Sequence, residues 1–261
     1  MRYFFCRDLR CGMSCHPRRK SHGVRWIALL GLTSALVSCA VRNTASPQHS
    51  SQSMPTPTAS SAEAELRALL RGMGVQLIAE EKRLEISGWV NMQKGLIEVF
   101  ACAPEGKTHE SLLVLDCIPS GIHAGLLALG LGHGTPVETG TEADYKPPTG
   151  DPVLVEVVWK TQQGDDRRVR AEDMIWNQGK KAPMAHISWL FTGSFSQSVT
   201  GNPEDASYAA DFVKSIITTH HDPSSVLENP LPDGRDDTLY YAREDLTPPV
   251  GTPVRLILTR G

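Results

Sequence analysis

The sequence predicts an α+β fold: a single, mainly antiparallel β domain with one or two short helices. Apolar and polar residues alternate in four segments, which indicates half-buried strands near residues 84–90, 153–159, 187–191 and 254–258. Two nearly continuous apolar runs, 96–102 and 111–117, are typical of strands in the interior of a sheet. Because no fixed-period repeat is present, we expect one domain over residues 61–261.

Two segments have the periodicity of helices. The first begins at Ser60 or Ser61, ends near Gly72 or Gly74, and has an apolar stripe of Leu66, Leu69, Leu70 and Met73. The second follows Pro119, with Ser120 as the expected N-cap and an apolar stripe of Ile122, Leu126 and Leu129. Gly130 and Gly132 can end it. Between the later strands, residues 165–168 are expected at the polar tip of a hairpin.

The amino-terminal region has the pattern of a lipoprotein signal peptide over residues 1–38. A cationic segment precedes about 13 mostly apolar residues, too few to span a bilayer, and Leu36-Val37-Ser38-Cys39 matches a lipobox. We expect cleavage before Cys39 and acylation of its thiol, which would anchor the chain in a lipid bilayer. Met13 is an alternative start, and a secreted protein without lipid is the alternative interpretation.

The residue after Cys39 is Ala40. Lipoproteins that are retained in the inner membrane typically resemble a pattern with an aspartate at this position, so the outer membrane is favoured here. Residues 39–60 are then the lipidated cysteine and a linker rich in Ser, Thr, Pro and Gln, which is expected to be flexible.

Charge excludes one class of partner. Residues 1–38 carry seven Lys or Arg and one Asp, so the remaining chain has 19 basic and 28 acidic residues and a formal charge of −9. Binding to a phosphate backbone needs clustered Lys and Arg. We therefore expect no nucleic acid partner, and an unidentified envelope ligand or protein instead.

Two cysteines, Cys102 and Cys117, remain in the folded body. In an oxidising envelope they could form a disulfide, which for a loop of about 15 residues contributes about 3 kcal/mol. Alternatively, each is a separately buried thiol that packs as a small apolar group. The sequence leaves both alternatives open.

Most residues able to carry chemistry lie between residues 98 and 123. Cys102 or Ser111 could be a nucleophile, His109 or His123 its base, and Glu98 or Glu110 the group that orients the base. His109, Glu110 and His123 could instead ligate zinc, although no His-Glu-x-x-His helix is present. The third interpretation is that polar groups hold a loop at a strand entrance. We predict the functional site in the window from Lys107 to His123.

Motifs in a fixed order resemble the YdjY-like domain family across roughly residues 75–260. The matching segments include Gly95-Leu96-Ile97-Glu98, Ala101-Cys102, His109-Glu110-Ser111, Ile122-His123-Ala124, Gly134-Thr135-Pro136-Val137, Trp189-Leu190-Phe191-Thr192-Gly193-Ser194 and Pro249-Val250-Gly251-Thr252-Pro253-Val254. This resemblance implies a domain without an assigned activity in envelope and lipoprotein-like chains. Some relatives carry a ferredoxin-type label, but a 4Fe-4S cluster needs four thiolates and the body has two. We expect no cofactor.

Other polar and aromatic residues have structural interpretations. His220-His221-Asp222 precedes a proline and is expected to be a solvated turn. The tryptophans at strand positions are expected in the core: Trp89, Trp159, Trp176 and Trp189. The resulting hypothesis is an envelope lipoprotein whose single domain is a non-catalytic binding or accessory module. The alternative is an envelope hydrolase or metal-binding protein that uses Cys102, His109, Glu110 and His123.

Overall fold

The computed structural model describes residues 59–261 except 139, 142 and 199. These residues belong to one compact unit, Pro55–Gly261. The predicted signal peptide, Cys39 and nearly all of the predicted linker lie outside the described residues.

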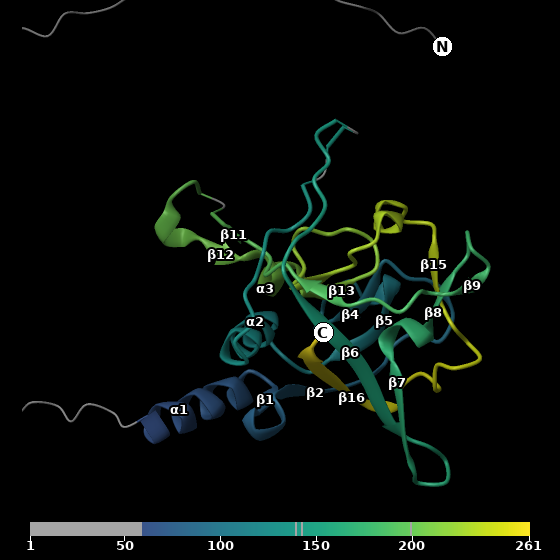
Figure 1. Cartoon of the computed structure of the whole chain (residues 1–261), viewed down its shortest axis with the longest axis horizontal. Helices are drawn as coiled ribbons and strands as arrows, with labels where there is room; N and C mark the ends of the chain where they lie inside the picture. Colours follow the sequence, from purple (N-terminus) through teal and green to yellow (C-terminus); the bar gives the residue numbers. More distant parts are fainter. Residues whose placement is uncertain (1–58, 139, 142, 199) are drawn as a thin grey trace, which may run out of the picture. The chain divides into compact units, whose positions relative to one another are not determined.

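A sheet that closes on itself forms the centre of the fold (Figure 1). Its eight strands, in spatial order, are β2 (Arg83–Val90), β16 (Pro253–Arg260), β6 (Asp151–Lys160), β10 (Trp189–Phe191), β14 (Leu227–Glu228), β13 (Ser215–Thr218), β4 (Val99–Cys102) and β5 (Ser111–Leu115). The ring closes because β2 pairs with both β16 and β5. Two of its neighbouring pairs are parallel, β4 with β5 and β13 with β14.

Smaller elements surround the ring. Strands β1 (Val75–Ile78) and β7 (Asp166–Arg170) extend it from β2 and β6, respectively. A second sheet contains β3 (Gly95–Leu96), β15 (Tyr240–Ala242), β8 (Ile175–Asn177) and β9 (Ala182–Pro183), and a hairpin contains β11 (Ser196–Gln197) and β12 (Ser207–Tyr208). The helices are α1 (Ala59–Gly72), α2 (Pro119–Ala128) and α3 (Ala209–Val213), with five 3-10 turns, Ala79–Glu81, Thr108–Glu110, Ala171–Met174, Pro203–Asp205 and Pro232–Arg235, between strands of the described chain.

The predicted class is confirmed in its main feature, since the domain is built mostly of β-strands with short helices. The predicted antiparallel sheet with one or two helices is too coarse a description of the fold. The described residues form three helices and a sheet that closes on itself. Closure depends on pairing between Gly88 and Leu115 and their neighbours. No local sequence pattern predicts that β2 pairs with β5.

The core fills the space enclosed by the strands and the elements that cover them. Its largest fully buried side chains are Trp189, Tyr240, Phe100 and Phe191. The prediction for the tryptophans is correct for Trp189 and Trp159, which are buried, and wrong for Trp176, which is half-buried, and for Trp89, which is 37% exposed. A separate small cluster joins Val99, Cys102 and Val114.

Helix α2 begins differently from the prediction. Pro119 occupies the first turn, the residue at the N-cap is Ile118, and the cap makes no side-chain hydrogen bond. The Ser120 backbone N–H instead donates to the Asp211 carboxylate of α3 at 2.7 Å. The prediction that Ser120 caps this helix is therefore wrong, because a carboxylate 91 residues away occupies that role.

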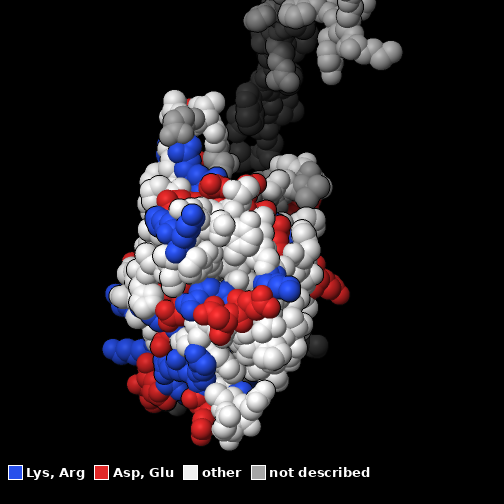
Figure 2. Space-filling model, turned by 90° about the vertical axis from the view of Figure 1, so that its right-hand side faces the viewer, with Lys and Arg blue, Asp and Glu red and all other residues white. Residues whose placement is uncertain are grey.

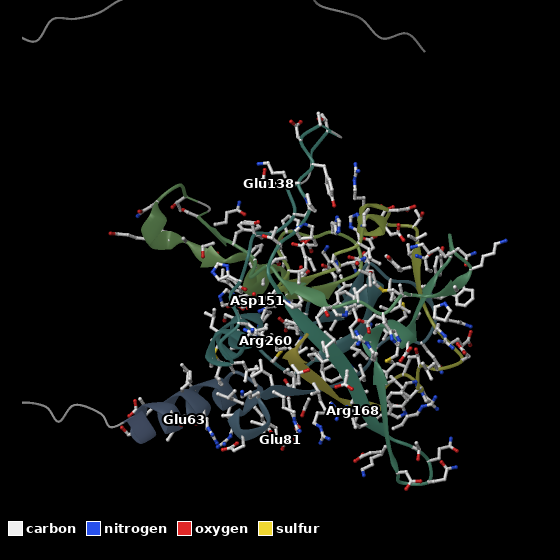
Figure 3. All side chains as sticks on the ribbon, viewed as in Figure 1. Glu63, Glu81, Glu138, Asp151, Arg168 and Arg260 are labelled. Carbon is white, nitrogen blue, oxygen red and sulfur yellow. The ribbon has the colours of Figure 1, made fainter. Side chains whose placement is uncertain are left out.

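The outer surface carries interspersed acidic and basic side chains (Figure 2). In the predicted hairpin of β6 and β7, Arg168 pairs with Glu156. At the other end of β6, the Arg260 guanidinium lies 3.3 Å from the Asp151 carboxylate (Figure 3). Both pairs are solvent-accessible, so each contributes at most about 1 kcal/mol.

Candidate functional site

Helices α2 and α3 and the β11–β12 hairpin lie together on one side of the domain (Figure 1). A pocket there is lined by residues of α2, of the segments that follow α2 and β10, and of the hairpin. Its volume is about 440 Å³. The lining residues are Ser120, His123, His133, Gly193, Ser194, Phe195, Ser196 and Tyr208. These residues come from four separate segments of the chain, which the closed sheet and its connections bring to one place.

His123 is oriented by two oxygen atoms. Its Nδ1 lies 2.9 Å from the Tyr208 hydroxyl oxygen and 3.2 Å from the Gly193 carbonyl oxygen, and that hydroxyl itself donates to the same carbonyl at 2.9 Å. A carbonyl only accepts hydrogen bonds, so Nδ1 must carry the proton. Nε2 of His123 therefore keeps its lone pair.

A second histidine, His133, lies beside the first and is exposed to solvent. Nδ1 of His133 lies 3.1 Å from the Gly134 carbonyl oxygen, which again places the proton on Nδ1. The His123 and His133 ring centroids are 5.3 Å apart, and the buried Phe191 ring contacts both by its edge at 5.0 and 6.0 Å. Neither Nε2 has a recorded hydrogen-bond partner among the described residues.

Burial keeps His123 and Tyr208 uncharged at neutral pH. Desolvation lowers the pKa of His123, His133 lowers it further, and the Gly193 carbonyl partly opposes both effects. Burial, together with the Asp211 carboxylate, raises the pKa of Tyr208 well above its ordinary range. The site therefore presents a neutral imidazole, held by a phenol that stays protonated.

Glycine is required at position 193. Its φ is +82°, and a Cβ there would lie 2.7 Å from Cβ and 2.9 Å from Cγ of His133. The same Cβ would lie 3.1 Å from Cε1 of His123. Any side chain would therefore displace the two rings as well as strain the backbone.

The predicted window is divided between this pocket and a separate cluster. His109 and Glu110 are not among the pocket residues. Instead, the Lys107 ammonium lies 3.5 Å from the Glu110 carboxylate and 3.3 Å from Asp222, which links the 3-10 turn Thr108–Glu110 to a distant loop. Burial lowers the pKa of Lys107, but the two carboxylates outweigh it and raise the pKa overall. His109 is 79% exposed.

The two predicted nucleophiles are enclosed. Ser111 is fully buried, and its hydroxyl donates to the Lys107 carbonyl at 2.7 Å. Cys102 is also fully buried, and burial raises the pKa of its thiol. A nucleophile must be accessible and activated, so this geometry does not favour attack by either residue.

Cys102 and Cys117 are free thiols in the structure. Cys102 belongs to β4, whereas Cys117 follows β5 and packs against the main core. Burial raises the pKa of Cys117 to about 12. Such a thiol is poorly reactive at neutral pH.

The structure does not assemble the predicted zinc ligands His109, Glu110 and His123. Across the part of the chain that the structure describes, no three His, Cys, Asp or Glu side chains are grouped so that they could hold a metal ion. His123 is next to His133 instead.

Sequence reasoning missed His133 and Tyr208 as site residues. His133 lies in a Gly-rich segment whose pattern is typical of the end of a helix. Tyr208 is 85 residues from His123, so no local pattern relates the two. The expectation that His220-His221-Asp222 is solvated is wrong for His221, which is 4% exposed. Its ring stacks on Tyr145 at 5.9 Å, and its Nε2 lies 3.0 Å from the Asn229 carbonyl.

Within residues 59–261 as described, no helix has both the length and the apolar character needed to cross a membrane.

The fold and site define a small β-rich domain with a histidine-lined pocket. By its sequence, the chain belongs to the YdjY domain family, whose model matches residues 77–259. That match covers nearly all of the closed sheet, and the predicted family is confirmed. Comparison with curated proteins and with solved structures found no match.

Proposed function

We propose that this protein is a lipid-anchored lipoprotein of the bacterial cell envelope, and that its YdjY domain is a non-catalytic module that binds a small polar ligand in the His123 pocket. The lipobox ending at Cys39 supports the anchor, with the outer membrane favoured by Ala40. The linker of residues 40–60 would hold the domain at the periplasmic or extracellular side of the bilayer.

One observation carries the assignment of the ligand site. His123 is fixed through Nδ1 by Gly193 and Tyr208, so its Nε2 is an oriented acceptor in a pocket of about 440 Å³. Ligand sites combine a concave surface with a few polar groups placed in this way. Phe195 supplies apolar surface in the pocket, and the buried Phe191 ring packs edge-on against His123. A ligand that donates a hydrogen bond fits this chemistry.

The non-catalytic assignment follows from what surrounds the acceptor. The predicted nucleophiles Cys102 and Ser111 are buried and lie outside the pocket. The Ser194 hydroxyl, which does line it, already donates to the Ser224 carbonyl at 2.8 Å. The hydrogen-bond partners of His123 within the described residues are Gly193 and Tyr208, not the serine hydroxyls of the pocket lining, which supports binding without a paired nucleophile.

A thermal-shift screen of the full-length, detergent-solubilised protein tests the pocket. A ligand specific for the native state should raise the melting temperature, with a stabilisation that grows as the logarithm of its concentration relative to Kd. His123→Gln should abolish the shift, whereas His109→Ala, which changes an exposed histidine outside the pocket, should retain it. Turnover of a screened ester or amide that depends on His123 would contradict the non-catalytic role and favour the hydrolase alternative.

Mass spectrometry of the protein extracted from native membranes tests the anchor. The expected amino terminus is a Cys39 that carries fatty acids, and Cys39→Ser should release the protein from the membrane fraction. An unacylated amino terminus on the native protein would contradict the lipoprotein assignment.

A further inference from the structure

Large apolar side chains are exposed mainly on one side of the domain, where α1, α2, α3 and the β11–β12 hairpin lie (Figure 1). Of the seven that are exposed in the described chain, five belong to these elements or directly adjoin them: Leu69, Ile118, Leu127, Phe195 and Phe212. Phe212 is the most exposed, at 79%. A single exposed apolar residue needs no explanation, whereas a group of them on one side of a domain marks a contact surface.

Two of these side chains border one groove. Phe195 and Phe212 line a concave surface of about 120 Å³ between α3 and the hairpin. Ala209 and Val213, the first and last residues of α3, add further apolar surface to the same groove. The two phenylalanine rings therefore belong to one continuous apolar surface.

Backbone contacts bring two more exposed side chains next to this groove. The Asp211 carboxylate, adjacent to Phe212, accepts the N–H that lies two residues after Ile118. The Ile118 N–H itself donates at 3.0 Å to the carbonyl of Met73, just after α1 and one turn beyond Leu69. We call the surface that contains Leu69, Ile118, Phe195 and Phe212 the apolar face.

The apolar face carries almost no charge. Helices α2 and α3 and strands β11 and β12 contain one charged residue, Asp211, whose carboxylate is occupied by the Ser120 N–H. Charged residues adjoin the face in the sequence, at Arg71, Asp116 and Lys214. A surface with an apolar centre and charges only beside it can enter an apolar medium without stripping water from an unpaired ion.

We propose that the apolar face docks on the lipid bilayer in which Cys39 is anchored. This inference rests on the lipid anchor of the proposed function. About 20 residues separate Cys39 from the start of α1, and a chain of that length reaches at most about 70 Å. Along α1, Leu69 follows about 15 Å later. An acylated Cys39 therefore keeps the apolar face within reach of the bilayer, at an effective concentration that populates even a weak contact.

The chemistry of the face selects the lipid interior rather than charged headgroups. Residues 39–261 have a formal charge of −9, so anionic lipids repel the domain instead of attracting it. Contact must then come from burial of the phenylalanine and aliphatic side chains at the boundary between headgroups and acyl chains. We expect docking on uncharged phosphatidylcholine bilayers.

Nitroxide labelling of the full-length protein, purified in detergent and reconstituted into phosphatidylcholine vesicles, tests the proposal. Oxygen concentrates in the bilayer and a nickel chelate stays in water, so the ratio of their collision rates with the label reports its surroundings. We expect a several-fold higher ratio for labelled Phe212→Cys and Ile118→Cys than for labelled Val250→Cys. Val250 is a matched control, because it is 62% exposed and lies outside the apolar face, between β15 and β16.

Two measurements accompany the labelling. Wild-type protein treated with the same reagent gives the background from Cys102 and Cys117. Circular dichroism shows whether each variant is folded, and Ile118→Cys carries the test if Phe212→Cys does not fold.

Three results would overturn docking on lipid. Equal ratios at positions 212 and 250, in protein whose Cys39 is acylated by mass spectrometry, would contradict the docking while leaving the anchor standing. An immobilised label at position 212 that neither reagent reaches would show that a partner protein covers the face. Spin–spin broadening at position 212 would show that a second copy covers it. An unacylated Cys39 would instead remove the anchor, and the docking with it.

Discussion

The Tyr208 hydroxyl lies 2.9 Å from Nδ1 of His123 and donates to the same Gly193 carbonyl that Nδ1 contacts. These atoms form a small closed network at the wall of the pocket. The orientation of His123 therefore depends on a hairpin 85 residues away in the sequence.

Tyr208→Phe should free the His123 ring while retaining the aromatic contact. Loss of the two hydrogen bonds of the hydroxyl should lower the free energy of unfolding by about 2 kcal/mol, because the Gly193 carbonyl keeps only the longer contact. The ¹⁵N shifts of His123 should also change from a single tautomer toward a mixture. Tyr241→Phe, in β15 and outside the pocket, is the control, and an unchanged tautomer in Tyr208→Phe would contradict the network.

Gly193→Ala should destabilise the protein more than an equivalent change elsewhere. A residue with φ of +82° costs about 1 kcal/mol when glycine is replaced, and here the new Cβ also meets His133. Gly164→Ala is a matched control, because its φ is +90° and no atom lies within 4 Å of the new Cβ. Urea denaturation should show a larger decrease in the free energy of unfolding for Gly193→Ala than for Gly164→Ala. Equal decreases would mean that the His123 and His133 rings move aside at no energetic cost.

Glu228→Gln should remove a pH-dependent loss of folding stability. Glu228 is fully buried, one carboxyl oxygen accepts the Val137 N–H at 3.2 Å, and the other has no partner among the described residues. Burial raises its pKa from 4.5 to about 8. The folded state then binds a proton that the unfolded state has released, so stability falls as pH rises from about 4.5 to about 8.

The Gln variant mimics the protonated acid and cannot ionise, so its stability should decline less over that pH window than that of the wild type. Urea titrations at pH 5, 6.5 and 8 measure the difference, with the exposed Glu65→Gln as the control. Parallel pH profiles for the wild type and Glu228→Gln would show that Glu228 ionises with an ordinary pKa.

Asp211→Ala should loosen the start of α2. The Asp211 carboxylate accepts the Ser120 N–H at 2.7 Å and places a negative charge at the positive end of the helix dipole. Loss of such a cap costs about 1 kcal/mol, and Asp211→Asn should cost less because the amide oxygen can still accept. The melting temperature should be highest for the wild type, lower for Asp211→Asn and lowest for Asp211→Ala. Asp165→Ala, which changes a residue at a hairpin tip, should leave the melting temperature unchanged. A stable Asp211→Ala protein would contradict the capping role.

The sequence predicted those parts of the fold that depend on local periodicity. Alternation at Val153, Val155 and Val157 identified β6, and the leucine stripe identified α1, because each pattern follows from burial of one face. The closed sheet was not predictable in this way, since Leu115 of β5 pairs with Gly88 of β2 across a connection that contains β3, β4 and a 3-10 turn. Ser120 is a second example: the local sequence predicted that Ser120 caps the helix, whereas the cap comes from Asp211, which is distant in the sequence.

The candidate site was predicted only for His123. Neighbouring titratable residues in the sequence suggested one cluster, but His109 and Glu110 belong to a 3-10 turn that faces Lys107, whereas His123 lies on the helix beyond β5. His133, Gly193 and Tyr208 reach the pocket from separate connections. Only the three-dimensional pairing of strands reveals that they belong together.

The position of the last strand has a consequence for how the chain acquires its structure. Strand β16 is inserted between β2 and β6, and pairs along almost its whole length with both. Until residues 253–260 have been synthesised, a nascent chain lacks the element that joins its first and middle thirds. Folding must then bring together segments separated by well over a hundred residues, which is slow compared with local helix or hairpin formation. Removal of only the final eight residues should therefore prevent folding of the whole domain rather than fray one end.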